Sequence, residues 1–191
     1  MKIILGSSSR WRAHVMRTIV PEFDVMEPGI DEKSIRNRNP QVLTSELAIA
    51  KSRALRPKVD GPAILITSDQ VVTYNGAIRE KPVTRMQAKQ FLESYRDGPA
   101  TCVTAVLGWN SVTGEEDLVV DEAKVWFKDL TDDAIDDIVR AGIIFDCAGG
   151  FAAGHPSFEP YIDRISGEME SVIGLPKALT TAMIASLSGE A

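Results

Sequence analysis

Residues 2–12 read KIILGSSSRWR, a short apolar strand that breaks at glycine and serines and then continues into a helix. This junction points free backbone N–H groups, the hydroxyls of Ser7 and Ser9 and the positive end of a helix dipole toward one place. Arg12 adds positive charge to the first helical turn, where an acidic residue would compensate the dipole. A phosphate would resolve this conflict, so we expect the junction to bind an anion.

Beyond this junction, strand patterns alternate with helix patterns, which predicts an α/β domain. We expect helices that begin near Arg10, Pro40, Thr84, Thr131 and Pro176, and strands over 63–67, 71–74, 77–79, 101–109 and 118–127. The last two strands are joined by a short turn and should be antiparallel, so the sheet is predicted to be mixed. Asn75-Gly76 predicts a type I′ hairpin turn. We also expect a strand over 145–151 and a structured loop over 152–174.

Composition narrows the class of protein. A chain of 191 residues that is 44% hydrophobic can bury one core, so we expect a single domain over residues 1–191. The net charge of −6 argues against a nucleic-acid surface. Two cysteines imply no disulfide framework, no secretory leader is visible, and no apolar run approaches the roughly 20 residues of a membrane span. These features predict a cytoplasmic protein without nucleic-acid or membrane partners, and a homodimer stays open.

Carboxylates supply the first candidates for chemistry. Asp69 follows the apolar run 63–67, and ligand crevices in α/β sheets form beyond the carboxyl ends of strands. A turn-forming aspartate is the plainer alternative. Asp31 and Glu32 form an acidic pair in a loop, which is either solvated surface or part of a site for a hard cation such as Mg²⁺.

Lysines supply the matching cations. Lys51 falls on the flank of the apolar stripe of its helix, so its stem can lie on the core while its ammonium reaches an edge. Lys81 precedes Pro82, which holds it extended. The histidines and cysteines show no catalytic pattern, and neither a Walker motif nor Gly-x-Gly-x-x-Gly is present. Serines, cations and carboxylates together suit a polyphosphate with a divalent metal, where a carboxylate positions or deprotonates water.

These residues together resemble Maf-type nucleoside triphosphate pyrophosphatases, a family first named for septum formation. The motifs that carry the resemblance are residues 5–12, Ile30-Asp31-Glu32, Leu47-Ala48 with Lys51, Ser68-Asp69-Gln70-Val71, Gly76 with Lys81-Pro82, Cys147-Ala148-Gly149-Gly150 and Gly174-Leu175-Pro176. The resemblance implies a fold like that of inosine triphosphate pyrophosphatases, with an elongated mixed sheet flanked by helices and a nucleotide cleft. It also implies hydrolysis of a nucleoside triphosphate to the monophosphate and pyrophosphate, with Mg²⁺ or Mn²⁺.

The resemblance also implies roles for single residues. Asp69 falls on the family's catalytic carboxylate and Arg12 on its loop arginine, while Glu32, Lys51 and Lys81 fall on the other charged positions. Glu32 and Asp69 would hold the metal, and Ser7, Ser9 and Arg12 the substrate.

Trp11 and Gln70 match the family branch that acts on N7-methyl-GTP. A dTTP/UTP pyrophosphatase or a non-catalytic, nucleotide-binding regulator of cell division are the alternatives. This chain departs from the family at Arg10, where proline is usual. Residues 151–156 also lack the branch glutamate, which Glu159 or Asp163 would have to replace.

Overall fold

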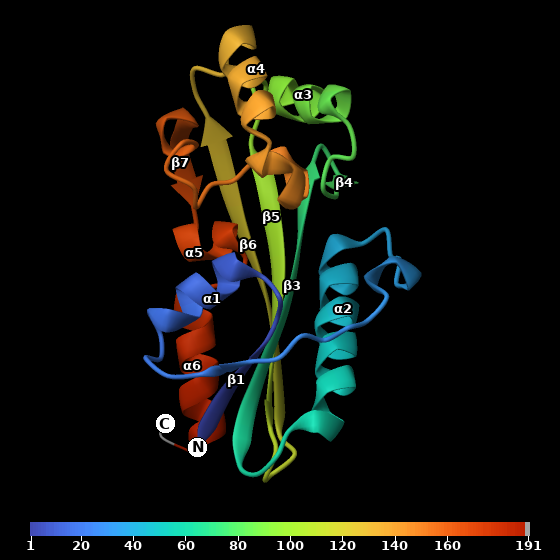
Figure 1. The fold of residues 1–191 in the computed structure, drawn as a ribbon, viewed down its shortest axis with the longest axis vertical. Helices are drawn as coiled ribbons and strands as arrows, with labels where there is room; N and C mark the ends of the chain where they lie inside the picture. Colours follow the sequence, from blue (N-terminus) through green and yellow to red (C-terminus); the bar gives the residue numbers. More distant parts are fainter. Residues whose placement is uncertain (190–191) are drawn as a thin grey trace.

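The computed structural model describes residues 1–189 and contains one mixed sheet (Figure 1). Within these residues the sheet has seven strands in the order β2-β1-β3-β5-β6-β7, with β4 paired to β3. The pairs β1–β2 and β1–β3 are parallel and the others are antiparallel, which confirms the predicted mixed sheet. The strands are β1 Lys2–Gly6, β2 Asp24–Val25, β3 Ala63–Tyr74, β4 Ala77–Arg79, β5 Ala100–Asn110, β6 Glu116–Phe127 and β7 Ile162–Ser166.

Helices cover both faces of this elongated sheet. Helix α2 (Pro40–Leu55) lies on one face, while α1 (Arg10–Arg17), α5 (Met169–Ile173) and α6 (Lys177–Ser188) lie on the other (Figure 1). Helices α3 (Arg85–Ser94) and α4 (Asp132–Ala141) lie together at the far end of the long strands. The predicted α/β fold is therefore confirmed. Within residues 1–189 no helix is long and apolar enough to cross a membrane.

Local signals explain why these elements begin and end where they do. Helix α2 has Asn39 as its cap, whose Oδ1 accepts from Val42 N at 3.0 Å, and Pro40 in its first turn. Thr84 and Thr131 cap α3 and α4 in the same way. At the predicted hairpin, Asn75 and Gly76 have φ values of 48° and 76°, the positive values that a type I′ turn requires.

Alternate side chains of β3 pack into two hydrophobic cores, one on each face of the sheet. Ile64 and Ile66 pack against α1 and α6, whereas Leu65 packs on the other face beside Leu55 of α2. Because successive strand side chains point to opposite faces, Thr67 and Asp69 share the face of Leu65, and Ser68 and Gln70 share that of Ile66.

Two predictions about the chain after residue 144 were wrong. The expected strand over 145–151 is instead two 3-10 turns, Ile143–Asp146 and Ala148–Gly150. Gly149 and Gly150 have φ values of 71° and 70°, outside the strand region, and Gly149 packs against Val72.

The expected loop over 152–174 contains a 3-10 turn, the strand β7 and the helix α5. Strand β7 forms because its residues pair with Lys124–Phe127 of β6. Short-range pattern does not reveal that partner.

Candidate active site

Asp69 lies at a gap in the pairing of β3. One edge of β3 pairs with β1 as far as Thr67 and with β4 from Val72, so residues 68–71 have no strand neighbour on that edge. The prediction that the strand ends before Asp69 was wrong, because β3 continues to Tyr74. The strand that does end here is β1, whose Gly6 pairs with Thr67 before the chain turns away into α1. Asp69 therefore lies in the middle of β3, at a break in the sheet where one edge of the strand has no partner.

Lys51 joins two carboxylates at this break. Its ammonium Nζ lies 2.5 Å from Asp69 Oδ1 and 2.9 Å from Glu32 Oε1, and it also donates to the Ser68 carbonyl at 3.4 Å. Lys51 is 4% exposed and Asp69 is 7% exposed, whereas Glu32 is more than half exposed. The predicted reach of Lys51 along the core to an edge is what the structure shows. Charge that is costly to bury is thus concentrated at one point of the sheet.

The surroundings shift the acidities of these carboxylates in opposite directions. Burial raises the pKa of Asp69 above its usual range, although the charges of Lys51 and Arg12 oppose the change. Burial also acts to raise the pKa of Glu32. There, however, the hydrogen bond from Lys51 and the charges of Lys51, Arg12 and Lys81 outweigh it, so that pKa is lowered. The same cluster of charges therefore acts on two carboxylates that differ in burial, and the pKa shifts have opposite signs.

The donor set fits a divalent cation. Carboxylate oxygens of Glu32 and Asp69 converge on one positively charged group, the Lys51 ammonium. Hard cations such as Mg²⁺ take one or two carboxylates and complete their shell with substrate phosphate and water. Within residues 1–189 no cluster of three or more His, Cys, Asp or Glu side chains is arranged to hold a metal. Glu32 and Asp69 are the two carboxylates that the structure brings together at this point.

Arg12 reaches this region from the opposite face of the sheet. Its Nε donates to the Gly174 carbonyl at 2.9 Å, and Ser68 Oγ donates to the same oxygen at 3.1 Å. Burial lowers the pKa of the guanidinium, and the charges of Asp69 and Glu32 oppose this shift. The charge of Arg12 acts on Asp69 and Glu32 across the unpaired edge of β3, where no strand separates α1 from Asp69.

The serines of the junction form the N-terminus of α1. Ser9 Oγ accepts from Arg12 N at 3.3 Å, and Ser7 Oγ accepts from Ser9 N at 3.1 Å. The first turn of α1 holds no acidic residue, as the sequence indicates. The hydroxyls keep their hydrogens available for an anion, because in these bonds they act only as acceptors.

Gln70 and Trp11 lie on the α1 face of the sheet. Gln70 Nε2 donates to the carbonyls of Ser171 and Val172 at 2.8 and 3.2 Å and lies 3.0 Å from Thr104 Oγ1. These partners occupy the amide nitrogen and leave Oε1 as the atom that can accept a bond from a ligand. The Trp11 ring meets His155 edge-on, with 6.4 Å between ring centres.

Several predicted residues stand outside these contacts. Asp31 is exposed and caps the turn Glu32–Ser34 by accepting from Lys33 N at 3.1 Å, so only Glu32 of the acidic pair meets Lys51. Lys81 is exposed, and its charge acts on Glu32. Glu159 is exposed, and Asp163 forms an ion pair with Arg164 at 3.6 Å. Within residues 1–189, neither carboxylate forms a hydrogen bond or ion pair with Trp11 or Gln70.

Sequence reasoning missed two contributors. The Gly174 carbonyl ties Arg12 to Ser68, and Gly174 has a φ of 110° that few other residues adopt. The Gly-Leu-Pro motif was the available signal. Arg10, noted above only as a departure from the family's proline, is the second: its guanidinium carbon lies 4.8 Å from the centre of the Trp11 ring.

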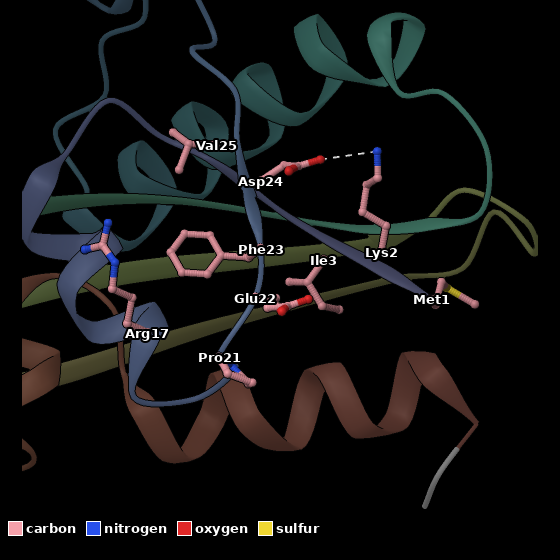
Figure 2. A pocket seen from close by; sticks show the side chains of 9 residues that line it. All are labelled: Met1, Lys2, Ile3, Arg17, Pro21, Glu22, Phe23, Asp24 and Val25. Carbon is pink, nitrogen blue, oxygen red and sulfur yellow. Dashed lines mark ion pairs between the residues drawn. The ribbon is translucent and has the colours of Figure 1, made fainter.

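A separate hollow of about 530 Å³ lies at the edge formed by β1 and β2 (Figure 2). Phe23 lies in it, with Arg17 of α1 5.8 Å from the ring centre. The ion pair between Lys2 and Asp24, at 3.2 Å, crosses its rim. None of the predicted site residues lines this hollow, so it is distinct from the break at Asp69.

Comparison with known proteins identifies the family of this chain. The profile of the family described as Maf-like protein matches residues 2–187. The chain therefore belongs to the Maf family, and the resemblance drawn from its motifs is confirmed.

Relatives named 7-methyl-GTP pyrophosphatase are similar over most of their length. That of Dictyostelium discoideum is 39% identical over 97% of both chains, and that of Idiomarina loihiensis is 32% identical over 92% of this chain and 89% of its own. Among solved structures, a HAM1 protein from Coxiella burnetii aligns over the full length of both chains with a TM-score of 0.49 and 11% identity. The Staphylococcus aureus Ham1 protein aligns over 68% of this chain and 73% of its own with a TM-score of 0.44 and 16% identity.

Proposed function

We propose that this Maf protein is a nucleoside triphosphate pyrophosphatase that prefers N7-methyl-GTP. The observation that carries the proposal is the buried pair of Lys51 and Asp69, joined by Glu32, at the unpaired edge of β3. A protein that only binds nucleotides gains little from a costly buried carboxylate, whereas hydrolysis needs a group that takes a proton from water. The names of the relatives from Dictyostelium discoideum and Idiomarina loihiensis support the choice of substrate.

In the proposed reaction, water attacks the α-phosphorus and the bond to the bridging oxygen of pyrophosphate breaks. Asp69, which lies beside Lys51 at the break, accepts the proton of the attacking water. Lys51 holds Asp69 in place through the 2.5 Å contact and adds positive charge beside the phosphates. The products are the nucleoside monophosphate and pyrophosphate.

Positive groups around the break would bind the triphosphate. Arg12, Lys51, Lys81 and the N-terminus of α1 with Ser7 and Ser9 supply fixed charge and hydrogen-bond donors. Glu32 and Asp69 would hold Mg²⁺ or Mn²⁺, which when bound neutralises phosphate charge and polarises the phosphoryl oxygens. Negative charge that develops during the displacement is thus met by groups already in place.

The base would lie on the α1 face. Trp11 offers an aromatic face, and N7-methylguanine carries a positive charge that such a face attracts. Gln70 Oε1 can accept from the N–H groups of guanine because its amide nitrogen is occupied by Ser171, Val172 and Thr104.

A panel of standard and modified nucleoside triphosphates with Mg²⁺ or Mn²⁺ tests this proposal. We expect monophosphate and pyrophosphate as products, with the highest kcat/KM for N7-methyl-GTP. Diphosphate and inorganic phosphate as products would contradict the reaction. A preference for dTTP or UTP would assign the chain to the alternative substrate class, and absence of hydrolysis with retained nucleotide binding would favour a regulator.

The setting of the reaction is part of the proposal. We propose a cytoplasmic location, which fits the unpaired cysteines Cys102 and Cys147. A homodimer is an expectation that light scattering coupled to size-exclusion chromatography measures directly.

A further inference from the structure

Arg10 covers the aromatic surface to which the proposed function assigns the base. Its guanidinium carbon lies 4.8 Å from the centre of the Trp11 ring, within the range of a cation–π contact. Arg10 is exposed at the first position of α1, and within residues 1–189 no ion pair ties it to a carboxylate. Among the described residues, the Trp11 ring is therefore the recorded partner of the Arg10 guanidinium.

The other groups that the structure places beside the Trp11 ring are His155 and Gly154. His155 meets the ring edge-on, and Gly154 lies so close that a Cβ there would stand 3.4 Å from Trp11 Cε3. Gly154 belongs to the segment 151–156, which lacks the glutamate that could pair with a cationic base. Within residues 1–189 no ion pair neutralises the Arg10 guanidinium that lies on the ring.

We propose that Arg10 is a specificity-determining residue that competes with a positively charged base for the face of Trp11. This inference rests on the proposed nucleotide site. Two cations cannot share one aromatic face without repulsion, so Arg10 weakens binding of a cationic base more than binding of a neutral base of the same shape. The preference for N7-methylguanine over guanine is consequently smaller in this chain than Trp11 alone would produce.

Binding of N7-methyl-GMP and GMP, measured by isothermal titration calorimetry at pH 6, tests the competition without turnover. In Arg10→Gln, which keeps a planar polar group and removes the charge, the ratio of the two affinities should rise by about two- to tenfold. Arg10→Lys keeps the charge and should leave the ratio close to that of the unchanged protein. In a Trp11→Leu background, Arg10→Gln should no longer change the ratio.

Arg17→Gln is the matched control. Arg17 lies on the same helix and also stacks on an aromatic ring, that of Phe23, but in the separate hollow of Figure 2. An unchanged or lower ratio in Arg10→Gln, or an equal rise in Arg17→Gln, would overturn the assignment. Equal weakening of both monophosphates by Arg10→Gln would make Arg10 a phosphate contact and would also overturn it. Failure of the unchanged protein to hydrolyse any triphosphate would remove the proposed function but not this binding comparison.

Discussion

Lys51 of α2 donates a hydrogen bond to Asp69 of β3, with 2.5 Å between Nζ and Oδ1. The two residues lie 18 positions apart in sequence and meet because α2 crosses the face of β3 on which Thr67 and Asp69 both point. Thr67 Oγ1 donates to the Ala48 carbonyl at 2.9 Å and so fixes α2 one turn before Lys51. This contact holds the proposed base in a defined position before substrate arrives.

Replacing Asp69 tests the proposed base. Asp69→Asn keeps the size of the side chain but removes the proton acceptor, so kcat/KM should fall by about 10²-fold or more. Circular dichroism should show a folded protein. The matched control is Asp31→Asn, since Asp31 is exposed and only caps a turn. Near-normal turnover of Asp69→Asn with metal present would exclude this role.

The cations around the break should act on phosphate and not on base. Arg12→Ala, Lys51→Ala and Lys81→Ala should each lower kcat/KM for all triphosphates by a similar factor, because phosphate is common to every substrate. Lys33→Ala serves as the control, since Lys33 lies in the exposed turn beside Glu32. A variant that alters base preference but leaves the overall rate unchanged would contradict the assignment of that residue to the phosphates.

Trp11 should set the preference for a charged base. Loss of the aromatic face in Trp11→Ala should reduce the kcat/KM ratio of N7-methyl-GTP to GTP by about 2- to 30-fold, which corresponds to about 0.5–2 kcal/mol of cation–π energy. The thermal midpoint of the variant checks that loss of the contact with His155 is not the cause. If the ratio stays constant, the base does not stack on Trp11.

A carboxylate introduced beside Trp11 should strengthen that preference. Gly154→Glu places a negative charge near the ring. Its Cβ would lie 3.3 Å from both Cδ1 and Cγ1 of Ile173, so the Ile173 side chain would have to move by a few tenths of an ångström. The kcat/KM ratio of N7-methyl-GTP to GTP should rise severalfold. Gly154→Gln controls for size. An equal effect of both variants would attribute the change to shape and not to charge.

Stability at high pH should depend on Tyr95. Burial raises the pKa of Tyr95 to about 12, and its hydroxyl donates to the Gly149 carbonyl at 2.8 Å. Because the pKa of Tyr95 is higher in the folded than in the unfolded protein, the neutral Tyr95 side chain makes its full contribution to the free energy of unfolding below pH 10. It is lost, by about 2–3 kcal/mol, as the pH rises toward 12.

Unfolding in urea between pH 8 and pH 12 measures this loss. Tyr95→Phe should cost about 1 kcal/mol at pH 8 through the missing hydrogen bond, yet it should lose less stability than the unchanged protein between pH 10 and 12. Burial also raises the pKa of Cys102 to about 12, so Cys102→Ala separates the contribution of the thiol. Parallel pH curves for Tyr95→Phe and the unchanged protein would contradict the prediction.

The sequence by itself determined the elements whose signals are local. Pro40 predicts the start of α2, Asn75-Gly76 the hairpin, and Thr84 and Thr131 the caps of α3 and α4, because each acts within about four residues. The motifs also identified the family and the charged residues that meet at the break, among them Lys51, whose position on the flank of the apolar stripe predicts its reach.

Tertiary structure alone decided the features that depend on partners distant in sequence. Strand β7 exists because Lys124–Phe127 offer a pairing edge, and residues 145–151 form turns because Gly149 fits against Val72. The place of Asp69 in the middle of β3 depends on where β1 leaves the sheet, and the contact of Arg10 with Trp11 depends on how α1 settles against it. Sequence periodicity records which side of an element is apolar, but it does not record which neighbour supplies the missing hydrogen bonds, and that neighbour determines these features.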